Sequence, residues 1–513
     1  MTFHAVARLD ELRDDRGIRL QVGAEEVVLL RHGQAVRAFQ AQCPHAGAPL
    51  EDGAVCAGRL ICPWHKAAFA LENGEVCEPP ALAHLKRYGV RVEEQTVWVD
   101  DQPMPATPPS SRRDNRCFVV VGAGAAGSAA IFALRSKGYA GRLVWIDPEH
   151  PTSYDRTALS KFVIAGDMAV EEIPSLLDPH FYRSADIQRL RGKVRAVDAD
   201  ARTLTLADGQ SLTYDAALLA TGGIAQRPAI AGAQLPGTFV LRSLADAEQL
   251  LDACAPGSRV VIIGDGFIGL EAASAMIKAG LQVQVVARHA VPLAKQLGQR
   301  IGRSLRDLHQ RNGVIFHPDT EAVRLEGTSR VEAVMLRDGT RLDTDLVLFG
   351  TGIKPATGLT RGLPLADDQS LQADGQMRVA EGLWAAGDML TFPLAGRPLR
   401  LEHWRLAQQQ AFLAAGNMLG GQREFADVPF FWTYHYGKTF EVLGHARDWT
   451  HIEYLGEPER QCFIALLCVD EQVESVVACE HQRTMAVLAQ RMQRPLSRSE
   501  ALALIEAIEG DGA

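Results

Sequence analysis

The sequence predicts a multidomain protein in which a small all-β domain is followed by two Rossmann-like α/β domains and a small α+β domain. Three observations support this prediction. Residues 1–99 alternate apolar and polar in short runs broken by Gly and Pro, and they contain a paired Cys/His motif. Two later segments each have the order strand, glycine-rich turn, helix, strand. We expect the α/β domains at 117–237 with 350–426 and at 238–349, a linker at 100–116, and the last domain at 427–513.

Length and charge exclude several classes of protein. At 513 residues the chain has room for about three to four domains of ~150 residues, and 47% of its residues are hydrophobic, which is ample for several cores. The net charge of -9, without a run dense in Lys and Arg, argues against a nucleic-acid partner. No basic segment followed by an apolar one opens the chain, and no apolar stretch approaches a membrane span. We therefore expect a cytoplasmic protein that binds neither nucleic acid nor membrane.

The N-terminal motif is Cys43-Pro-His45 followed, after sixteen residues, by Cys62-Pro-Trp-His65. Two thiolates and two imidazoles in this pattern are the ligand set of a Rieske [2Fe–2S] centre, in which Cys43 and Cys62 bind one iron and His45 and His65 the other. The alternative is a Cys2His2 zinc site. Zinc modules usually begin with two Cys separated by two to four residues, whereas here each Cys has its own His nearby. The motif therefore predicts a cluster that carries single electrons.

The residues around these ligands predict a low reduction potential. High-potential Rieske proteins have an extra Cys in each ligand loop and hydroxyl groups that bond the cluster sulfurs, whereas this chain has Ala48, Trp64, Ala67 and Phe69 at the corresponding positions. Hydrogen bonds to the sulfurs stabilise the reduced cluster, so their absence predicts a potential near the low end of the Rieske range, on the order of −150 mV. Such a potential suits a ferredoxin that accepts electrons from a flavin.

The expected linker holds four prolines and two serines between Pro103 and Ser111. This composition disfavours both strand and helix, and it is typical of a semi-stiff spacer. Fully extended, residues 100–116 would reach up to about 55 Å. The N-terminal domain could therefore move relative to the rest of the chain.

The first glycine fingerprint follows the linker. The apolar run Cys117–Val121 leads into Gly122-Ala-Gly124-Ala-Ala-Gly127, a helical stretch, and a second strand that ends at Asp147. The glycines let the backbone approach a pyrophosphate at the helix N-terminus, and the carboxylate can accept hydrogen bonds from the adenosine ribose. Glycine-rich turns also occur for packing alone, so the flanking strands and the terminal acid are what make the prediction strong.

The same unit occurs again. The strand Arg259–Ile263 leads into Gly264-Asp-Gly266-Phe-Ile268-Gly269, a helix, and a second strand that ends at Ala287. Two units predict two bound dinucleotides. Two further apolar runs end in glycine where the chain crosses between the units, at Thr221-Gly222 and at Gly352. Another apolar run ends at Asp388, whose carboxylate could hold a ribityl hydroxyl.

Residues from about 117 to 450 resemble the two-dinucleotide flavoproteins that include apoptosis-inducing-factor-like proteins and the ferredoxin reductases serving oxygenases. With its N-terminal motif, the whole chain resembles the Rieske-fused members of the apoptosis-inducing-factor-like group. The resemblance implies FAD at the first fingerprint, NAD(P)H at the second, and a C-terminal segment that packs against the flavin and often forms a dimer. The matching segments are both fingerprints, Tyr154–Lys161, Ala220–Gly222, Ala386–Asp388, Glu402–Trp404 and Phe431–Trp432.

The resemblance also implies roles for single residues. Arg156 and Lys161 occupy the positions of a flavin-contacting Arg and Lys, the Lys near flavin N5, where a cation stabilises the reduced flavin. Glu271 occupies the position of its ion-pair partner. We expect Lys161 and Glu271 to be catalytic, the alternative being ordinary solvated helix charge. Further expected cofactor contacts are Val194, Ile268, Glu402, His403 and Trp432, of which His403 and Trp432 could instead be ordinary buried residues.

The sequence lacks two cysteine motifs through which electrons leave related flavoproteins. Disulfide reductases of this architecture have a redox Cys pair just after the ribose acid, but no Cys lies between Asp147 and Lys161. Sirohaem nitrite reductases need a four-Cys motif beyond the flavoprotein, and the three C-terminal Cys do not provide it. Electrons should therefore leave through the Rieske cluster.

The coenzyme is predicted from the end of the second unit. NAD-selective units usually end their second strand with an acid, whereas here Ala287 is followed by Arg288. A guanidinium without a carboxylate suits the 2′-phosphate of NADPH. The alternative is that Arg288 stacks on the adenine or lies in solvent. We expect NADPH to be preferred and NADH to be usable.

We therefore predict an NAD(P)H-dependent, FAD-containing ferredoxin reductase, monomeric or homodimeric, with its ferredoxin fused at the N-terminus. Electrons would pass from NAD(P)H to FAD, then to the Rieske [2Fe–2S] cluster, then to an external acceptor such as an oxygenase component. Two alternatives stay open. One is an NAD(P)H oxidase or quinone reductase in which the cluster is an accessory, and the other is a non-enzymatic protein that senses NAD(P)H and changes its association state.

Overall fold

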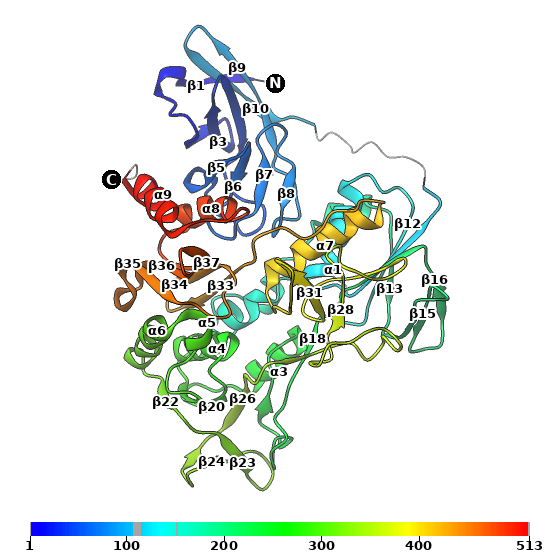
Figure 1. The fold of residues 1–513 in the computed structure, drawn as a ribbon, viewed down its shortest axis with the longest axis vertical. Helices are drawn as coiled ribbons and strands as arrows, with labels where there is room; N and C mark the ends of the chain where they lie inside the picture. Colours follow the sequence, from blue (N-terminus) through cyan, green and yellow to red (C-terminus); the bar gives the residue numbers. More distant parts are fainter. Residues whose placement is uncertain (1, 106–113, 150–151, 511–513) are drawn as a thin grey trace.

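The computed structural model describes residues 2–105, 114–149 and 152–510 of the chain. Figure 1 shows four units: the N-terminal β domain in blue at the top, the first α/β domain in cyan and yellow at the right, the second α/β domain in green at the bottom, and the C-terminal domain in orange and red at the left. This arrangement confirms the predicted fold class.

Two antiparallel sheets form the N-terminal domain, in the orders β1-β10-β9-β4-β3-β2 and β5-β6-β7-β8. The run Val27–Leu30 of β3 is apolar throughout because one face packs into the outer core of the domain and the other packs beside Cys43 and Cys62. The strands are β1 (Phe3–Arg8), β2 (Gly17–Val22), β3 (Glu25–His32), β4 (Ala35–Gln40), β5 (Ala54–Cys56), β6 (Arg59–Ile61), β7 (Ala68–Ala70), β8 (Val76–Glu78), β9 (Arg87–Glu93) and β10 (Thr96–Pro103).

The end of β10 differs from the expectation for the linker. The strand runs to Pro103, so residues 100–103 are strand although their composition predicted neither strand nor helix. The pairing of β10 with β9 is irregular between Val99 and Pro103, and such a break lets a proline lie in a strand. Residues 106–113, which hold two of the four prolines, lie outside the described residues.

The first α/β domain is built on a sheet with the order β13-β12-β11-β17-β30-β29, in which the first five strands are parallel. Helices α1 (Ala125–Ser136) and α7 (Trp404–Met418) pack into its core, and small side chains on both let them approach closely. The strands are β11 (Cys117–Val121), β12 (Arg142–Asp147), β13 (Ile187–Arg191), β17 (Ala216–Leu219), β29 (Arg378–Ala380) and β30 (Leu383–Ala385).

Smaller elements complete the first α/β domain. A π-helical turn at Leu159–Val163 and the helix α2 (Pro179–Ser184) follow the second strand of the fingerprint. Two three-stranded sheets extend from the domain, β14 (Val194–Asp198) with β15 (Thr203–Leu206) and β16 (Ser211–Thr213), and β28 (Leu371–Gln372) with β31 (Leu390–Leu394) and β32 (Arg397–Leu399).

The second α/β domain repeats the plan with a parallel sheet in the order β19-β26-β20-β21-β22. The two chain crossings between the α/β domains pair with each other as β18 (Gly223–Ala225) and β27 (Ile353–Pro355). The remaining elements are β19 (Thr238–Phe239), α3 (Leu244–Ala253), β20 (Arg259–Ile263), α4 (Phe267–Lys278), β21 (Gln282–Val286), α5 (Ala294–Leu297), α6 (Gln299–Arg311), β22 (Ile315–His317), β23 (Ala322–Glu326), β24 (Ala333–Leu336), β25 (Arg341–Asp343) and β26 (Leu346–Phe349).

The C-terminal domain is a five-stranded antiparallel sheet, β33-β34-β37-β36-β35, with two helices. It contacts the other three units, because β33 lies against α4 and α7 while α8 lies against β5 (Figure 1). The elements are β33 (Phe430–His435), β34 (Lys438–Gly444), β35 (His451–Glu457), β36 (Cys462–Val469), β37 (Gln472–Cys479), α8 (Gln482–Arg491) and α9 (Arg498–Gly510).

The N-terminal domain is docked on the C-terminal domain in this structure. Ala54, Ile61 and Ala68 of the smaller N-terminal sheet share one buried apolar cluster with Ala486 of α8. The linker composition allowed this domain to move, but composition describes only the reach of a segment and not the surfaces it can bring together. The docking positions the Cys/His loops against the rest of the chain.

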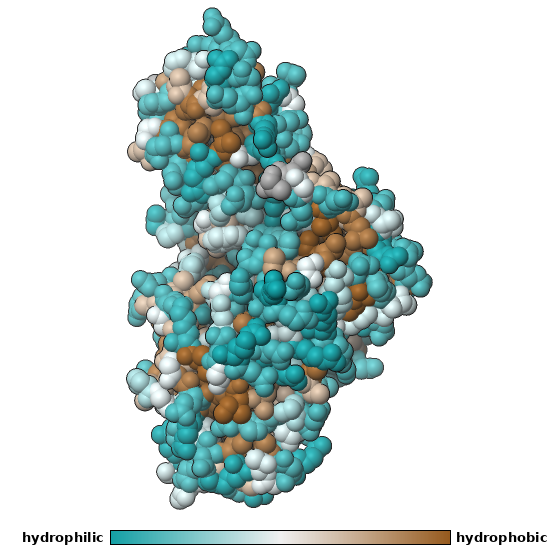
Figure 2. All heavy atoms as spheres, turned by 90° about the vertical axis from the view of Figure 1, so that its left-hand side faces the viewer, coloured by the Kyte–Doolittle hydropathy of each residue, from teal (hydrophilic) through white to brown (hydrophobic). Residues whose placement is uncertain are grey.

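None of the helices in the described part of the chain has the length and apolarity that a membrane span requires. Figure 2 shows a mainly hydrophilic face with separate apolar patches, one of them on the uppermost lobe, which the N-terminal domain forms. Patches of this kind are common on protein surfaces.

Candidate functional site

A cavity of about 1790 Å³ lies where the two α/β domains meet the C-terminal sheet. Its volume exceeds the ~300–1,000 Å³ of an ordinary small-ligand pocket, so it has room for more than one ligand. Most of the residues predicted from the sequence as cofactor contacts line it: Gly122, Gly124, Asp147, Arg156, Lys161, Val194, Thr221, Gly222, Gly266, Ile268, Glu271, Gly352, Asp388, Glu402, His403 and Trp432.

Four predicted contacts do not line the cavity. Gly127, Gly264 and Gly269 lie behind the fingerprint turns, where a Cβ on Gly127 would come 1.8 Å from the carbonyl oxygen of Gly122 and one on Gly269 would come 2.3 Å from that of Gly264. The glycines at 127 and 269 are therefore required for packing of helix against turn. Arg288 lies outside the cavity, with its side chain 72% exposed and paired with Glu321 at 3.2 Å.

The first fingerprint has the geometry of a dinucleotide cradle. The helix α1 begins directly after Gly124, whose missing Cβ leaves the helix N-terminus open to the cavity, with Arg156 as the nearest group at 4.0 Å. The Asp147 carboxylate accepts hydrogen bonds from the backbone N–H groups of Ala123 (2.7 Å) and Glu149 (2.8 Å), and burial raises its pKa. An anion-binding helix end beside an oriented acid fits the pyrophosphate and ribose of FAD.

Lys161 and Glu271 form a buried ion pair of 3.1 Å in the cavity wall. The lysine comes from the π-helical turn and the glutamate from α4, so the pair joins the two α/β domains. Glu271 also accepts hydrogen bonds from the hydroxyls of Ser160 (2.7 Å) and Thr433 (2.8 Å). With both carboxylate oxygens bonded, the side chain is held in one orientation, as a buried charge requires.

Two histidines that the sequence did not predict continue this network into the C-terminal domain. The ring of His435 bonds the Thr433 hydroxyl through Nε2 at 2.9 Å and packs edge-on against His309, with ring centroids 5.1 Å apart. Burial lowers the pKa of His435 to about 3 and lowers that of His309 well below its usual range. Both rings are therefore neutral, and they leave the charge of the network on Lys161 and Glu271.

Other predicted contacts are held by neighbours at the cavity wall. Asp388 pairs with Arg242 at 2.7 Å, and the Thr221 hydroxyl donates to the carbonyl of Ala356 at 2.9 Å. His403 stacks on Phe431 with centroids 4.1 Å apart, and burial lowers its pKa to about 4. A neutral imidazole in this wall can take part in hydrogen bonds without adding charge.

The two Cys/His loops have matching backbone geometry. The N–H of Cys43 donates to the carbonyl of Ala48, and the N–H of Cys62 donates to that of Ala67, each at 2.8 Å. The Nδ1 atoms of His45 and His65 lie 3.1 Å apart. The neighbouring thiol of Cys62 and then burial raise the pKa of Cys43, while burial lowers the pKa of both histidines.

The four ligands fit two metal ions better than one. Cys62 is the hydrogen-bonding neighbour of the Cys43 thiol, and the imidazoles of His45 and His65 face each other, as the two iron sites of a [2Fe–2S] cluster require. Among the described residues, a surface group of Asp14, Asp15 and His32 is the only one that brings three or more potential ligand atoms within 4.8 Å of one another. No three ligand atoms of the Cys/His motif come this close together, whereas the four ligands of a single zinc ion would.

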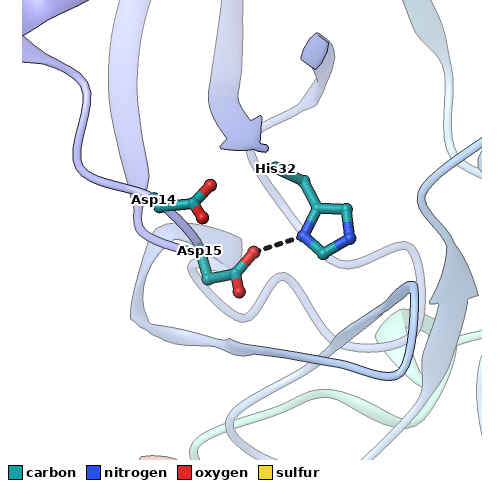
Figure 3. A group of neighbouring side chains, drawn as sticks. All are labelled: Asp14, Asp15 and His32. Carbon is teal, nitrogen blue, oxygen red and sulfur yellow. Dashed lines mark hydrogen bonds and ion pairs between the residues drawn. The ribbon is translucent and has the colours of Figure 1, made fainter. Parts of the chain in front are cut away.

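The surface group itself has a structural explanation. Figure 3 shows Asp15 bonded to the ring of His32, at 2.6 Å, with Asp14 beside them. Asp14 accepts the backbone N–H of Gly33 at 2.7 Å, so the two acids tie the β3–β4 turn to the segment before β2. The Asp15 carboxylate raises the pKa of His32. The group is partly exposed, and we assign it no ligand.

The docked N-terminal domain brings His65, one of the predicted cluster ligands, to the cavity. The ring of His65 packs on Trp432 with centroids 4.1 Å apart and an angle of 43° between the planes. Trp432 lines the cavity, and the ammonium of Lys161 lies 5.8 Å from its ring centroid. The indole therefore lies between the Cys/His loops and the cavity, and sequence reasoning, which expected a cofactor contact or an ordinary buried residue here, did not predict the contact with His65.

Buried polar contacts fix this arrangement, and sequence reasoning missed them. Arg405 of α7, only 2% exposed, pairs with Glu78 at 2.7 Å and donates to the carbonyls of Pro79 and Lys66, both at 2.9 Å. A second buried pair, Lys66 with Glu441 at 2.6 Å, lies beside it. One signal was present in the sequence, since Glu441 interrupts the otherwise apolar run from Phe440 to Leu443.

Comparison with known proteins agrees with this geometry. Residues 117–411 match the family described as pyridine nucleotide-disulphide oxidoreductase, and residues 2–89 match the Rieske [2Fe-2S] domain. Apoptosis-inducing factor 3 of Homo sapiens is 29% identical over 95% of this chain and 83% of its own length. The biphenyl dioxygenase system ferredoxin--NAD(+) reductase component of Paraburkholderia xenovorans is 36% identical over 72% of this chain and 91% of its own.

Among solved structures, the covalent putidaredoxin reductase–putidaredoxin complex has a TM-score of 0.72 and 27% sequence identity, covering 78% of this chain and 100% of that chain. The ferredoxin reductase for the CYP199A2 system from Rhodopseudomonas palustris has a TM-score of 0.70 and 26% identity, covering 75% and 97%. Both similarities cover most of the present chain.

Proposed function

We propose that this chain, which belongs to the pyridine nucleotide-disulphide oxidoreductase family and carries a Rieske [2Fe–2S] domain at its N-terminus, passes electrons from NAD(P)H through FAD to its own cluster and then to an external acceptor. It is an oxidoreductase of the ferredoxin--NAD(+) reductase type. The contact of His65 with Trp432 at 4.1 Å carries the proposal, because it connects a cluster ligand to the wall of the flavin cavity.

The side chains of the cavity support this function. FAD, when bound, supplies the chemistry of accepting a hydride and releasing single electrons. Lys161 holds a positive charge at the cavity wall, where it can stabilise developing negative charge, and Glu271 fixes its position. Trp432 lines the cavity and contacts His65, so its ring connects the cavity wall to the Cys/His loops. Arg405 and Glu78 hold the two domains in register.

For the acceptor we propose an oxygenase component, and for the coenzyme NADPH in preference to NADH. The first proposal is supported by the names of similar proteins, several of which are reductases of dioxygenase systems. The second is supported by Ala287, which stands where an acid would repel a 2′-phosphate, and by the exposed guanidinium of Arg288 next to it, which can turn from Glu321 toward a ligand.

The cluster ligands give the direct test of the proposed function. Because each iron needs both of its protein ligands, His65→Ala should abolish the Rieske absorbance and the electron paramagnetic resonance signal while FAD stays bound and is still reduced by NAD(P)H. His32→Ala, in the same domain but at the surface, is the matched control and should keep both signals. Stoichiometric zinc without iron in the anaerobically purified wild type would contradict the proposal.

The route to the cluster has its own test. Trp432→Leu should leave reduction of FAD by NAD(P)H measurable and slow the appearance of the reduced Rieske signal after it, because the ring between cavity and His65 is lost. Stopped-flow absorbance at flavin and Rieske wavelengths separates the two events. If the delay between the two signals is the same as in the wild type, electrons do not pass by way of this contact.

A further inference from the structure

The two ligand loops differ at one position where the backbone demands the same conformation. Gly47 and Lys66 each stand directly before the alanine that closes the loop, and both have positive φ, 75° and 60° respectively. A left-handed backbone suits glycine and strains a residue that has a Cβ. The first loop thus uses the unstrained residue and the second does not. We therefore expect the lysine side chain to make an interaction that offsets the cost of this backbone conformation.

That side chain is buried beneath its own loop. Its exposed fraction is 0%, and its ammonium donates to the carbonyl of Pro63, to the carboxylate of Glu441 at 2.6 Å and to the carbonyl of Gln482 at 3.2 Å. The carbonyl of Trp64 lies 3.4 Å away. Pro63 and Trp64 separate Cys62 from His65 in the sequence, so the positive charge lies against the backbone that carries two cluster ligands.

Glu441 holds the ammonium from the other side. It lies on β34 of the C-terminal domain, is 2% exposed, and its second oxygen is buried without a hydrogen-bond partner. The ammonium therefore stands between the ligand loop and the carboxylate, with the positive end of the pair toward the cluster site. In a dry interface this orientation has a stronger electrostatic effect than in water.

We propose that Lys66 is a tuning residue of the Rieske centre, whose buried ammonium raises the reduction potential of the cluster, and that Glu441 holds it in place. Reduction adds negative charge to the cluster, and a nearby cation stabilises that charge. Ala48, Ala67 and Phe69 offer no hydroxyl to the cluster sulfurs, so the lysine supplies a stabilisation that the loops otherwise lack. Electron transfer from a flavin to the cluster is thereby favoured.

This inference rests on the proposed function, because it presumes a Rieske cluster. The test is a redox titration of the intact holoenzyme with mediators and dithionite, in which electron paramagnetic resonance measures the reduced cluster. Lys66→Met, which keeps the buried stem without its charge, should shift the midpoint potential to more negative values. Lys66→Gly, which copies Gly47 and relieves the strain, should give a shift of the same sign. Lys66→Arg should stay near the wild-type potential.

The matched control is Glu78→Gln, which removes the carboxylate of the other buried interdomain ion pair and keeps Lys66 and Glu441. Its partner Arg405 donates to the carbonyl of Lys66, so this variant leaves an uncompensated cation near the ligand loop and should not lower the potential. The inference is overturned if both neutral variants at position 66 keep the wild-type potential, or if Glu78→Gln lowers it as far as Lys66→Met does, because loosened docking would then explain the effect. A wild type without a Rieske signal would instead overturn the proposed function.

Discussion

The two fingerprint units share the same backbone arrangement but differ in their polar side chains. Each begins at a glycine with φ above 100°, Gly122 at 110° and Gly264 at 116°, whose N–H donates to a backbone carbonyl near the end of the second strand. Those acceptors are Ile146 and Val286, so Asp147 and Ala287 occupy equivalent positions. Each unit continues into a helix of 12 residues. The backbone requirements of the two units are therefore the same.

The two units differ in side chains at positions where the backbone conformation does not require a particular residue. The residue two places after the last fingerprint glycine is Ala129 in the first unit, fully buried in the core, and Glu271 in the second, paired with Lys161. At the strand end the first unit has Asp147, bonded to two backbone N–H groups, and the second has Ala287. The first unit thus has an acid, Asp147, that is oriented to bind a ribose. The second unit instead places a charged side chain, Glu271, between the two α/β domains.

The largest effect is expected for Glu271, the helix acid that has no counterpart in the first unit. Glu271→Ala leaves the buried Lys161 without a counter-charge, so we expect reduction of FAD by NAD(P)H to slow by roughly 10²-fold, or FAD to bind more weakly, while the Rieske spectrum is unchanged. Lys161→Ala should behave similarly, and the double variant should be little worse than either single one. Stopped-flow absorbance measures the rates.

Glu271→Gln provides the control for shape, since it can still bond the hydroxyls of Ser160 and Thr433 but lacks the charge. We expect its rate to lie between those of the wild type and Glu271→Ala. Unchanged reduction rates and flavin content in both Ala variants would remove the ion pair from the account of the site.

A smaller effect is expected at the glycine that each unit uses for packing. A Cβ at Gly127 would meet the carbonyl oxygen of Gly122 at 1.8 Å, and one at Gly269 would meet that of Gly264 at 2.3 Å. We expect either alanine variant to lower the free energy of unfolding by about 1–3 kcal/mol, with Gly127→Ala the worse. FAD content should fall in Gly127→Ala and be retained in Gly269→Ala.

Thermal unfolding and the absorbance of bound flavin measure these effects. Gly416→Ala is the matched control, because it lies in α7 with only the end of Lys137 nearby at 3.9 Å, and alanine favours a helix more than glycine does. Loss of FAD from Gly269→Ala rather than from Gly127→Ala would reverse the assignment of the two units.

Much of the fold was predictable because its signals are local. The glycine turns, the strands beside them and the spacing of Cys43, His45, Cys62 and His65 are each written within a few dozen residues. The pairing of Lys161 with Glu271, which are 110 positions apart, was implied only by family resemblance. What the sequence could not provide was the docking of the N-terminal domain.

That docking depends on surfaces whose residues are far apart in the chain. Arg405 and Glu78 are separated by 327 positions, and His65 contacts Trp432 of the C-terminal domain, which lies beyond both the linker and the two α/β domains in the sequence. A buried pair between domains has no periodic pattern to reveal it. The fully buried Lys66 is similarly hidden, because a single lysine in a loop is usually solvated.

The smallest expected effect concerns the coenzyme, and it tests whether the strand-end difference between the units has a function. Arg288→Ala should lower the ratio of kcat/KM for NADPH to that for NADH by about tenfold, because a charge-assisted bond to the 2′-phosphate is lost. Ala287→Asp, which gives the second unit the acid of the first, should lower the same ratio by repelling that phosphate. Steady-state kinetics with both coenzymes measure it.

Arg303→Ala, an exposed arginine of α6 in the same domain, controls for the general loss of positive charge and should leave the ratio unchanged. Arg288 lies outside the cavity in this structure, so the prediction requires its side chain to leave Glu321 when the coenzyme binds. A wild type that prefers NADH, as the names of the dioxygenase reductases would suggest for those proteins, contradicts the assignment of NADPH. An unchanged ratio in Arg288→Ala contradicts the role of the guanidinium even if NADPH is preferred.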